Sequence, residues 1–179
     1  LLCMLALNVS SDVLLGFELV DDSLTVSTEN STAQNGDTYT RFEELYTTNP
    51  EKTKEWYEQA QHLKRRSDSL YNHIDDLKWR CVKEADGKKA DIHNIKRSDN
   101  LDAASRVMLP PNSRRGRDLR LAIESYRTFI MGMVTDSLQR KVIMDNFSTQ
   151  PSKRSKKKAS NWEIALFEGM PLGAVVTMF

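Results

Sequence analysis

The feature that most constrains the fold is a run of residues between 56 and 81 whose spacing alternates between four and three. Its members are Trp56, Ala60, Leu63, Ser67, Leu70, Ile74, Leu77 and Cys81. This spacing places all of these side chains on one seam of an α-helix, and charged residues occupy the opposite face. Asn49 can cap such a helix and Pro50 fits its first turn, whereas Asp86-Gly87 is a stop signal. A helix over residues 50–85 would be roughly 50 Å long, so it has to pack along other helices.

The rest of the chain also favours helices. No segment shows the strict alternation of apolar and polar residues that is typical of strands, and the chain has only 7 Gly and 5 Pro. The polar stretch at residues 29–37 contains Asn35-Gly36 and is predicted to form a loop. Further helices are predicted at residues 39–46, 101–109, about 114–144, and from the capping-box pattern at 160–163 onward. The predicted fold is all-α, an elongated antiparallel helical bundle.

The N-terminal stretch changes character without a helix breaker. Residues 1–7 (LLCMLAL) are apolar throughout, polar residues follow, and from residue 13 onward one apolar seam continues. A helix that is apolar all round and then amphipathic is typical of one that leaves a bilayer. Because a complete span needs about 20 apolar residues, the remainder would precede Leu1. Residues 1–12 are therefore predicted to be the C-terminal part of a transmembrane helix, and residues 13–179 a helical domain outside the membrane.

Other interpretations of the two ends remain open. The apolar run at residues 1–7 also fits the tail of a cleaved signal peptide or a buried core segment. A second membrane helix starting at residues 170–179 would make the chain a sensor domain between two spans. The basic residues at 153–158 precede that run. Because positive charges near spans tend to stay cytoplasmic, a span there would place the whole bundle inside the cell. Pro171 and Gly173 fit a kinked packing helix equally well.

Composition and motifs argue against several function classes. The net charge of +1 does not suit a nucleic-acid binder, and the basic run at 153–158, without interleaved aromatic residues, is interpreted as a solvated loop. Cys3 and Cys81 are predicted to be buried thiols rather than a disulfide pair. His62 and His73 would lie about 16 Å apart along one helix, too far to share a metal ion. No metal, nucleophile or phosphate-loop motif occurs, so we expect no catalytic residue, no metal site and no cofactor.

Specific strings resemble a known family. LALNVSSDVLLGF at residues 5–17, NPEKTKEWY at 49–57, ADGKKADIHNI at 85–95, NLDAASRVML at 100–109 and NWEIALFEGMPLGAVVT at 161–177 resemble the GldM/PorM family. The strings follow in the same order and with similar spacing over nearly the whole chain. GldM/PorM proteins are the inner-membrane M subunits of the gliding motor and type IX secretion system of Bacteroidota.

The resemblance implies a function that periodicity cannot supply. The resemblance implies a single-pass inner-membrane protein with a short cytoplasmic N-terminus and several periplasmic domains. They form homodimers whose membrane helices are enclosed by a ring of multi-span L subunits (GldL/PorL). The assembly is thought to convert proton-motive force into movement that passes through the periplasm to outer-membrane components. This chain would match the end of the membrane helix and the first, helical periplasmic domain.

Within that arrangement, two sets of residues are candidate contacts. The membrane-ring set faces the dimer partner or the L ring and comprises Leu1, Leu2, Met4, Leu5 and Asn8. The dimer-contact set comprises Val13, Phe17, Val20 and Leu24. An intrachain contact fits the second set equally well, because heptad spacing does not identify the surface against which a seam packs. Residues 1–7 contain no Asp, Glu, Lys, Arg or His, so proton-coupling residues would lie upstream of Leu1.

Overall fold

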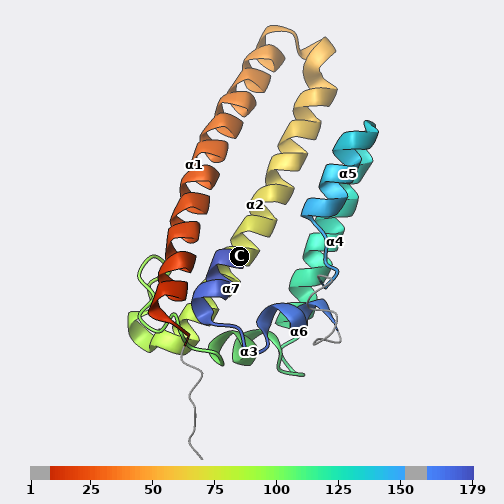
Figure 1. Cartoon of the computed structure of the whole chain (residues 1–179). Helices are drawn as coiled ribbons and strands as arrows, with labels where there is room; N and C mark the ends of the chain where they lie inside the picture. The colour runs from red at the N-terminus through yellow and green to blue at the C-terminus, as the bar shows by residue number, and fades with distance from the viewer. Residues whose placement is uncertain (1–8, 152–160) are drawn as a thin grey trace, which may run out of the picture. The chain divides into compact units, whose positions relative to one another are not determined.

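A computed structural model describes residues 9–151 and 161–179 of the chain, and every regular element in these ranges is a helix (Figure 1). The all-α prediction is therefore confirmed. The helices are α1 (Ser11–Thr48), α2 (Pro50–Asp86), the short 3-10 helix η1 (Gly87–Lys89), α3 (Ala103–Met108), α4 (Arg115–Met133), α5 (Ser137–Asn146), α6 (Trp162–Phe167) and α7 (Leu172–Met178).

The membrane-helix prediction falls mostly on residues 1–8, which lie outside the described residues. In the part of the chain that the structure describes, no helix combines the length and apolar character needed to cross a bilayer. α1 itself begins at Ser11, after the apolar run.

The predicted loop at residues 29–37 is wrong, because α1 continues through it to Thr48. Hydroxyl groups that favour turns elsewhere donate here to carbonyls one turn earlier. Ser31 Oγ lies 2.9 Å from Ser27 O, and Thr38 Oγ1 lies 2.9 Å from Gln34 O. These bonds satisfy the side chains inside the helix, so the local preference for a turn loses to helix continuation.

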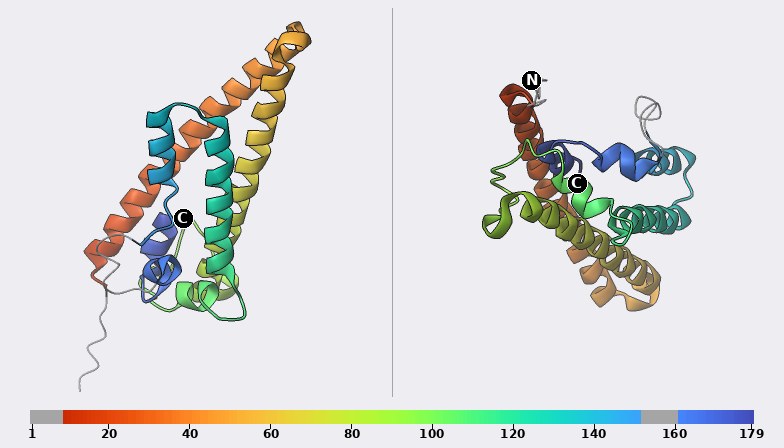
Figure 2. Two further views of the ribbon diagram at one scale, coloured as in Figure 1. Left: turned by 90° about the vertical axis from the view of Figure 1, so that its right-hand side faces the viewer. Right: turned by 90° about the horizontal axis from the view of Figure 1, so that it is seen from below.

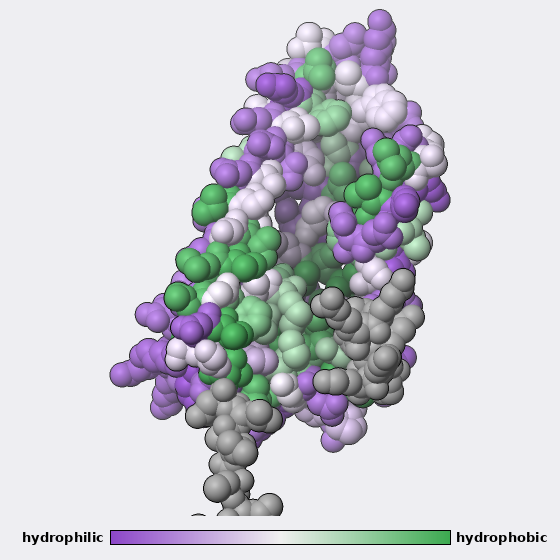
Figure 3. Space-filling model, viewed as in Figure 1, coloured by the Kyte–Doolittle hydropathy of each residue, from purple (hydrophilic) through white to green (hydrophobic). Residues whose placement is uncertain are grey.

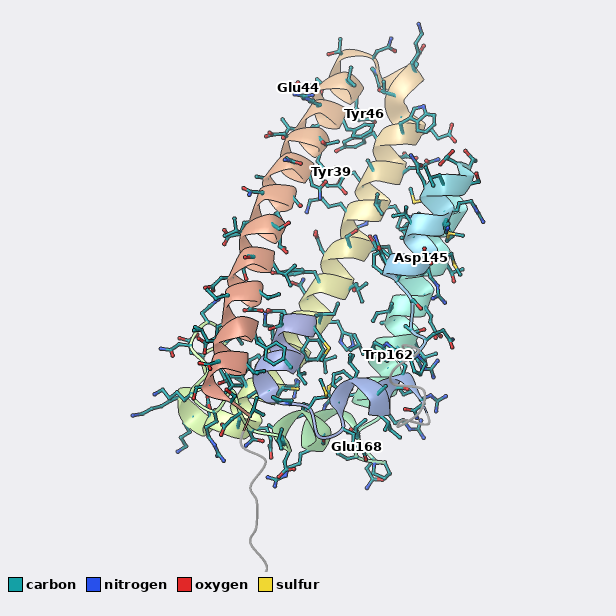
Figure 4. All side chains as sticks on the ribbon, in the orientation of Figure 1. Tyr39, Glu44, Tyr46, Asp145, Trp162 and Glu168 are labelled. Carbon is teal, nitrogen blue, oxygen red and sulfur yellow. The ribbon has the colours of Figure 1, made fainter. Side chains whose placement is uncertain are left out.

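The helix predicted at 39–46 is the last part of α1. There Tyr39 and Tyr46 point from α1 toward α2 (Figure 4). The ring of Tyr46 stacks on that of Tyr57 with 4.6 Å between centroids, an arrangement typical of a packed aromatic pair. This contact closes the hairpin formed by α1 and α2.

The prediction of α2 is confirmed almost to the residue. The N–H of Lys52 donates to Asn49 Oδ1 over 3.4 Å, and the helix ends at Asp86. Leu77 and Cys81 of the predicted seam are buried, whereas Trp56 is 62% exposed. Cys81 is a free thiol, as predicted, and burial raises its pKa to about 12.

The single helix predicted at 114–144 is wrong, because residues 134–136 separate α4 from α5 (Figure 2). Asp136 Oδ1 accepts from the N–H of Gln139 over 2.8 Å and caps the new helix. Arg140 Nη1 lies 2.7 Å from the carbonyl oxygens of both Met131 and Val134. At this break the Asp136 carboxylate therefore accepts from a backbone N–H at the start of α5, and the Arg140 guanidinium donates to backbone carbonyls at and after the end of α4.

The last predicted helix also divides in two. Asn161 caps α6 by accepting from the N–H of Ile164 over 2.8 Å, so the cap lies one residue later than the predicted capping box places it. Gly169, with φ of +63°, and Pro171 then turn the chain before α7.

The chain divides into two compact units. The first, which we call the base unit, comprises residues 1–22, 75–118 and 150–179. Its core is formed by Leu77, Cys81, Val82, Ala104, Met108, Phe167, Leu172, Val175 and Val176, all at most 2% exposed. Packing at Gly116 is close, since a Cβ there would lie 2.9 Å from Met108 O.

The second unit, which we call the hairpin unit, comprises residues 23–74 and 119–149. Polar contacts join its helices: the hydroxyls of Ser67 and Tyr126 are 2.8 Å apart, and Arg66 Nη2 donates to Ser125 Oγ over 3.1 Å. Its interior is thinner than that of the base unit, because only Ala60, Leu119 and Thr149 fall among its buried residues.

Candidate interaction surface

The first turns of α1 are held in the base unit by one face of the helix. Leu14, Phe17 and Asp21, spaced three and four apart, share this face. Thr177 Oγ1 of α7 donates to the carbonyl oxygen of Phe17 over 3.3 Å. Asp21 Oδ1 lies 3.6 Å from Lys78 Nζ of α2, and both side chains are largely buried, at 27% and 19% exposure. α1 is therefore fixed to the two helices beside it.

The outward faces of α1 carry several apolar side chains that are about half exposed in the described chain. Val13, Val20 and Leu24 are each about half exposed, at 48%, 49% and 49%. Leu15, Leu19 and Val26 form a second stripe and are exposed at 53%, 59% and 56%. Figure 3 shows hydrophobic residues gathered along the start of this helix. Exposed apolar surface is a common feature of sites that contact a protein or a membrane.

The structure divides the predicted dimer-contact set. Phe17 is half-buried, its carbonyl oxygen accepts the bond from Thr177, and it lines a groove beside α7. Val13, Val20 and Leu24 are each about half exposed and flank Phe17 on the helix. The membrane-ring residues Leu1, Leu2, Met4, Leu5 and Asn8 lie outside the described residues. The second stripe was missed, although its spacing of four and seven could have revealed it.

A groove of about 230 Å³ lies between α1, residues 92–98 and α7. Its acidic residues are Glu18, Asp21 and Asp22, and Asp21 is already paired with Lys78. Among the described residues, no three histidine, cysteine or carboxylate side chains come together as metal ligands would. The histidines do not cluster either: His62 packs on Phe129 with 4.9 Å between ring centroids, and His93 is exposed in the loop.

Comparison with known proteins identifies the family. The sequence model described as the GldM N-terminal domain matches residues 12–179, which is nearly the whole chain. A search of curated proteins returns no significant match. The matched range begins at the first turn of α1 and includes every helix from α2 to α7, so the resemblance seen in separate strings holds over the folded domain. The chain therefore belongs to the GldM family of gliding-motility and type IX secretion motor components, as its N-terminal domain.

Proposed function

We propose that this chain is the membrane-proximal part of a motor subunit that is driven by proton-motive force and carries movement from the inner membrane into the periplasm. The family match over residues 12–179 carries the proposal. The role is mechanical, so it requires neither a catalytic residue nor a cofactor. The subunit would be a single-pass inner-membrane protein with most of its mass in the periplasm.

Helix α1 supports a mechanical role. It runs without a break for 38 residues, or roughly 57 Å, and starts just after the apolar run at residues 1–7. Its first turns are joined to α2 through Asp21 and Lys78, and to α7 through the carbonyl of Phe17. Movement that reaches the first turn of α1 would therefore be carried along the whole unbroken helix to Thr48.

The exposed apolar residues support the proposed partners. Val13, Val20 and Leu24 form an outward stripe suited to the same stripe of a second copy, as in a homodimer. The membrane-ring set from Leu1 to Asn8 would contact a ring of GldL/PorL-type subunits. Later periplasmic and outer-membrane components would be reached through further domains of the M subunit.

The alternative of a sensor domain between two membrane helices is less well supported. That function would use residues 170–179 as the start of a second span. Instead, residues 172–176 of α7 are buried in the base unit. The N–H of Gly173 also donates to Ser98 O over 2.8 Å, so this segment is part of the domain's core.

The test is to soften α1 without changing its length. In the full-length protein, residues 31–36, all exposed, would be replaced by glycine and serine in one variant and by alanine in the matched control. Each helical glycine costs about 1 kcal/mol relative to alanine, so only the first variant gains a flexible joint. We expect the glycine–serine variant to remain in the membrane complex but to lose gliding and secretion, and the alanine control to retain both. Full activity of the flexible variant would exclude α1 as the transmitting element.

A further inference from the structure

The base unit has a second, basic groove that the proposed function does not use. It has a volume of about 420 Å³ and lies where α2 ends, beside η1, α3 and the start of α4. Its charged residues are Arg80, Lys83, Glu84, Lys88, Arg106 and Arg115. Five cations and one carboxylate therefore share one concave surface.

Some of these cations are already paired. Arg80 Nε lies 2.6 Å from Asp76 Oδ2, and Arg106 contacts Glu84 at 3.8 Å and Asp102 at 3.5 Å. Counting these three carboxylates against five cations leaves a net charge of +2 at the groove. In the described part of the chain, neither Lys83 nor Lys88 has a carboxylate within ion-pair distance.

An aromatic side chain lies beside Lys83. Lys83 Nζ is 4.4 Å from the ring centroid of Trp79, and this indole is 39% exposed. Tryptophan is enriched at the headgroup level of membranes, where one edge of the ring is apolar and the other can donate a hydrogen bond. The groove thus combines an interfacial aromatic with free positive charge.

The position of the groove relates it to the bilayer. α1 and α2 run in opposite directions and meet at Asp21 and Lys78. From Asp21 back to Ser11 is about 15 Å of helix, and from Lys78 forward to Asp86 is about 12 Å. The end of α2, whose residues line the groove, therefore lies level with the start of α1 (Figure 1). If residues 1–7 lie in the bilayer, the groove reaches the headgroup layer.

We propose that this groove binds the anionic headgroup of a membrane phospholipid. Phosphate oxygens accept hydrogen bonds from lysine and arginine, and basic residues at a membrane surface attract anionic lipid. The inference rests on the proposed function, because it requires the membrane anchor. An acidic protein segment would satisfy the same charges, but the groove's level at the start of α1 favours lipid.

The experiment uses full-length protein in vesicles of phosphatidylcholine, with or without phosphatidylglycerol. A photo-reactive amino acid replaces Lys89, which is exposed beside the groove without lining it, or Lys52 at the start of α2 as a control. We expect the probe at 89, and not at 52, to form phosphatidylglycerol adducts in excess of that lipid's share of the mixture. Excess inorganic phosphate should leave the adduct in place, since the source is the membrane.

Charge variants then test recognition. Lys83→Gln with Lys88→Gln should lower the adduct by about fivefold for each lysine removed, whereas Lys52→Gln with Lys54→Gln should leave it unchanged. Adducts that merely follow lipid composition, that form on protein, or that disappear in phosphate would overturn the proposal. Flotation with pure phosphatidylcholine vesicles reports the anchor separately: protein that fails to float refutes the proposed function, and protein that floats without lipid enrichment refutes this inference alone.

Discussion

At the scale of single residues, the surroundings of two glycines differ in how tightly they are packed. The Cβ of an alanine at position 116 would lie 2.9 Å from Met108 O and 3.3 Å from Glu163 Cγ, whereas at Gly36 nothing lies within 4 Å. Gly116→Ala should therefore lower the free energy of unfolding by about 1–3 kcal/mol through overpacking. Gly36→Ala should raise it by about 0.5–1 kcal/mol. Urea unfolding of both variants checks the pair, and equal stabilities would contradict the packing described at Gly116.

Glu124 provides a pH-dependent test at the same scale. The hydroxyl of Thr149, 2.7 Å from Glu124 Oε1, lowers the pKa of this carboxyl, and Arg120 adds to the effect. Because the folded pKa lies below the unfolded value of about 4.3, the stabilisation is present above that pH and is lost as pH falls through the folded pKa. Thr149→Val should raise the pKa toward its ordinary value, as read by NMR titration. An unchanged titration would show that this hydrogen bond is not the cause.

The thiol of Cys81 should be unreactive in the folded protein. Its thiol is 0% exposed, and a pKa of about 12 leaves almost no thiolate at neutral pH. We expect no maleimide labelling at this position under native conditions and complete labelling in denaturant. Rapid native labelling would mean that the base unit opens locally.

At the scale of elements, prediction succeeded where burial decided the outcome and failed where local signals competed with it. The seam from Trp56 to Cys81 predicted α2 because its apolar period and its flanking stop signals agree. Asn35-Gly36 predicted a turn, but α1 has hydroxyls that bond within the helix and packed residues on both sides of that dipeptide. The break after Met133 was missed because apolar spacing continues across it. Only Asp136 signalled a new cap, and the contribution of Arg140 comes from tertiary geometry.

That missed turn can be tested through its cap. Asp136→Ala removes the acceptor for the N–H of Gln139 and should destabilise the hairpin of α4 and α5 by about 1 kcal/mol. Asp136→Asn is the matched control, since an amide oxygen still caps the helix. Thermal unfolding distinguishes the two, and equal losses would indicate that charge rather than the hydrogen bond matters.

At the scale of the whole molecule, the exposed stripe of α1 predicts self-association. Val20→Asp should weaken a homodimer of the full-length protein, because it places a charge in the proposed apolar contact. Leu45→Asp is the control: Leu45 is 56% exposed on the same helix but lies outside the proposed contact. Analytical ultracentrifugation in detergent measures both. A dimer that survives Val20→Asp would direct attention to the second stripe at Leu15, Leu19 and Val26.

The unbroken course of α1 has a consequence for how its length can vary. Leu14, Phe17 and Asp21 near the start of the helix, and Tyr39, Phe42 and Tyr46 near its end, are half-buried, and their spacing places them on one helical face. Each residue inserted between these two sets would rotate one against the other by about 100°. Seven residues restore the alignment to within about 20°. We therefore expect α1 to reject single insertions, and to accept seven added residues only when α2 is lengthened by the same number, so that the Asp21–Lys78 and Tyr46–Tyr57 contacts both stay in register.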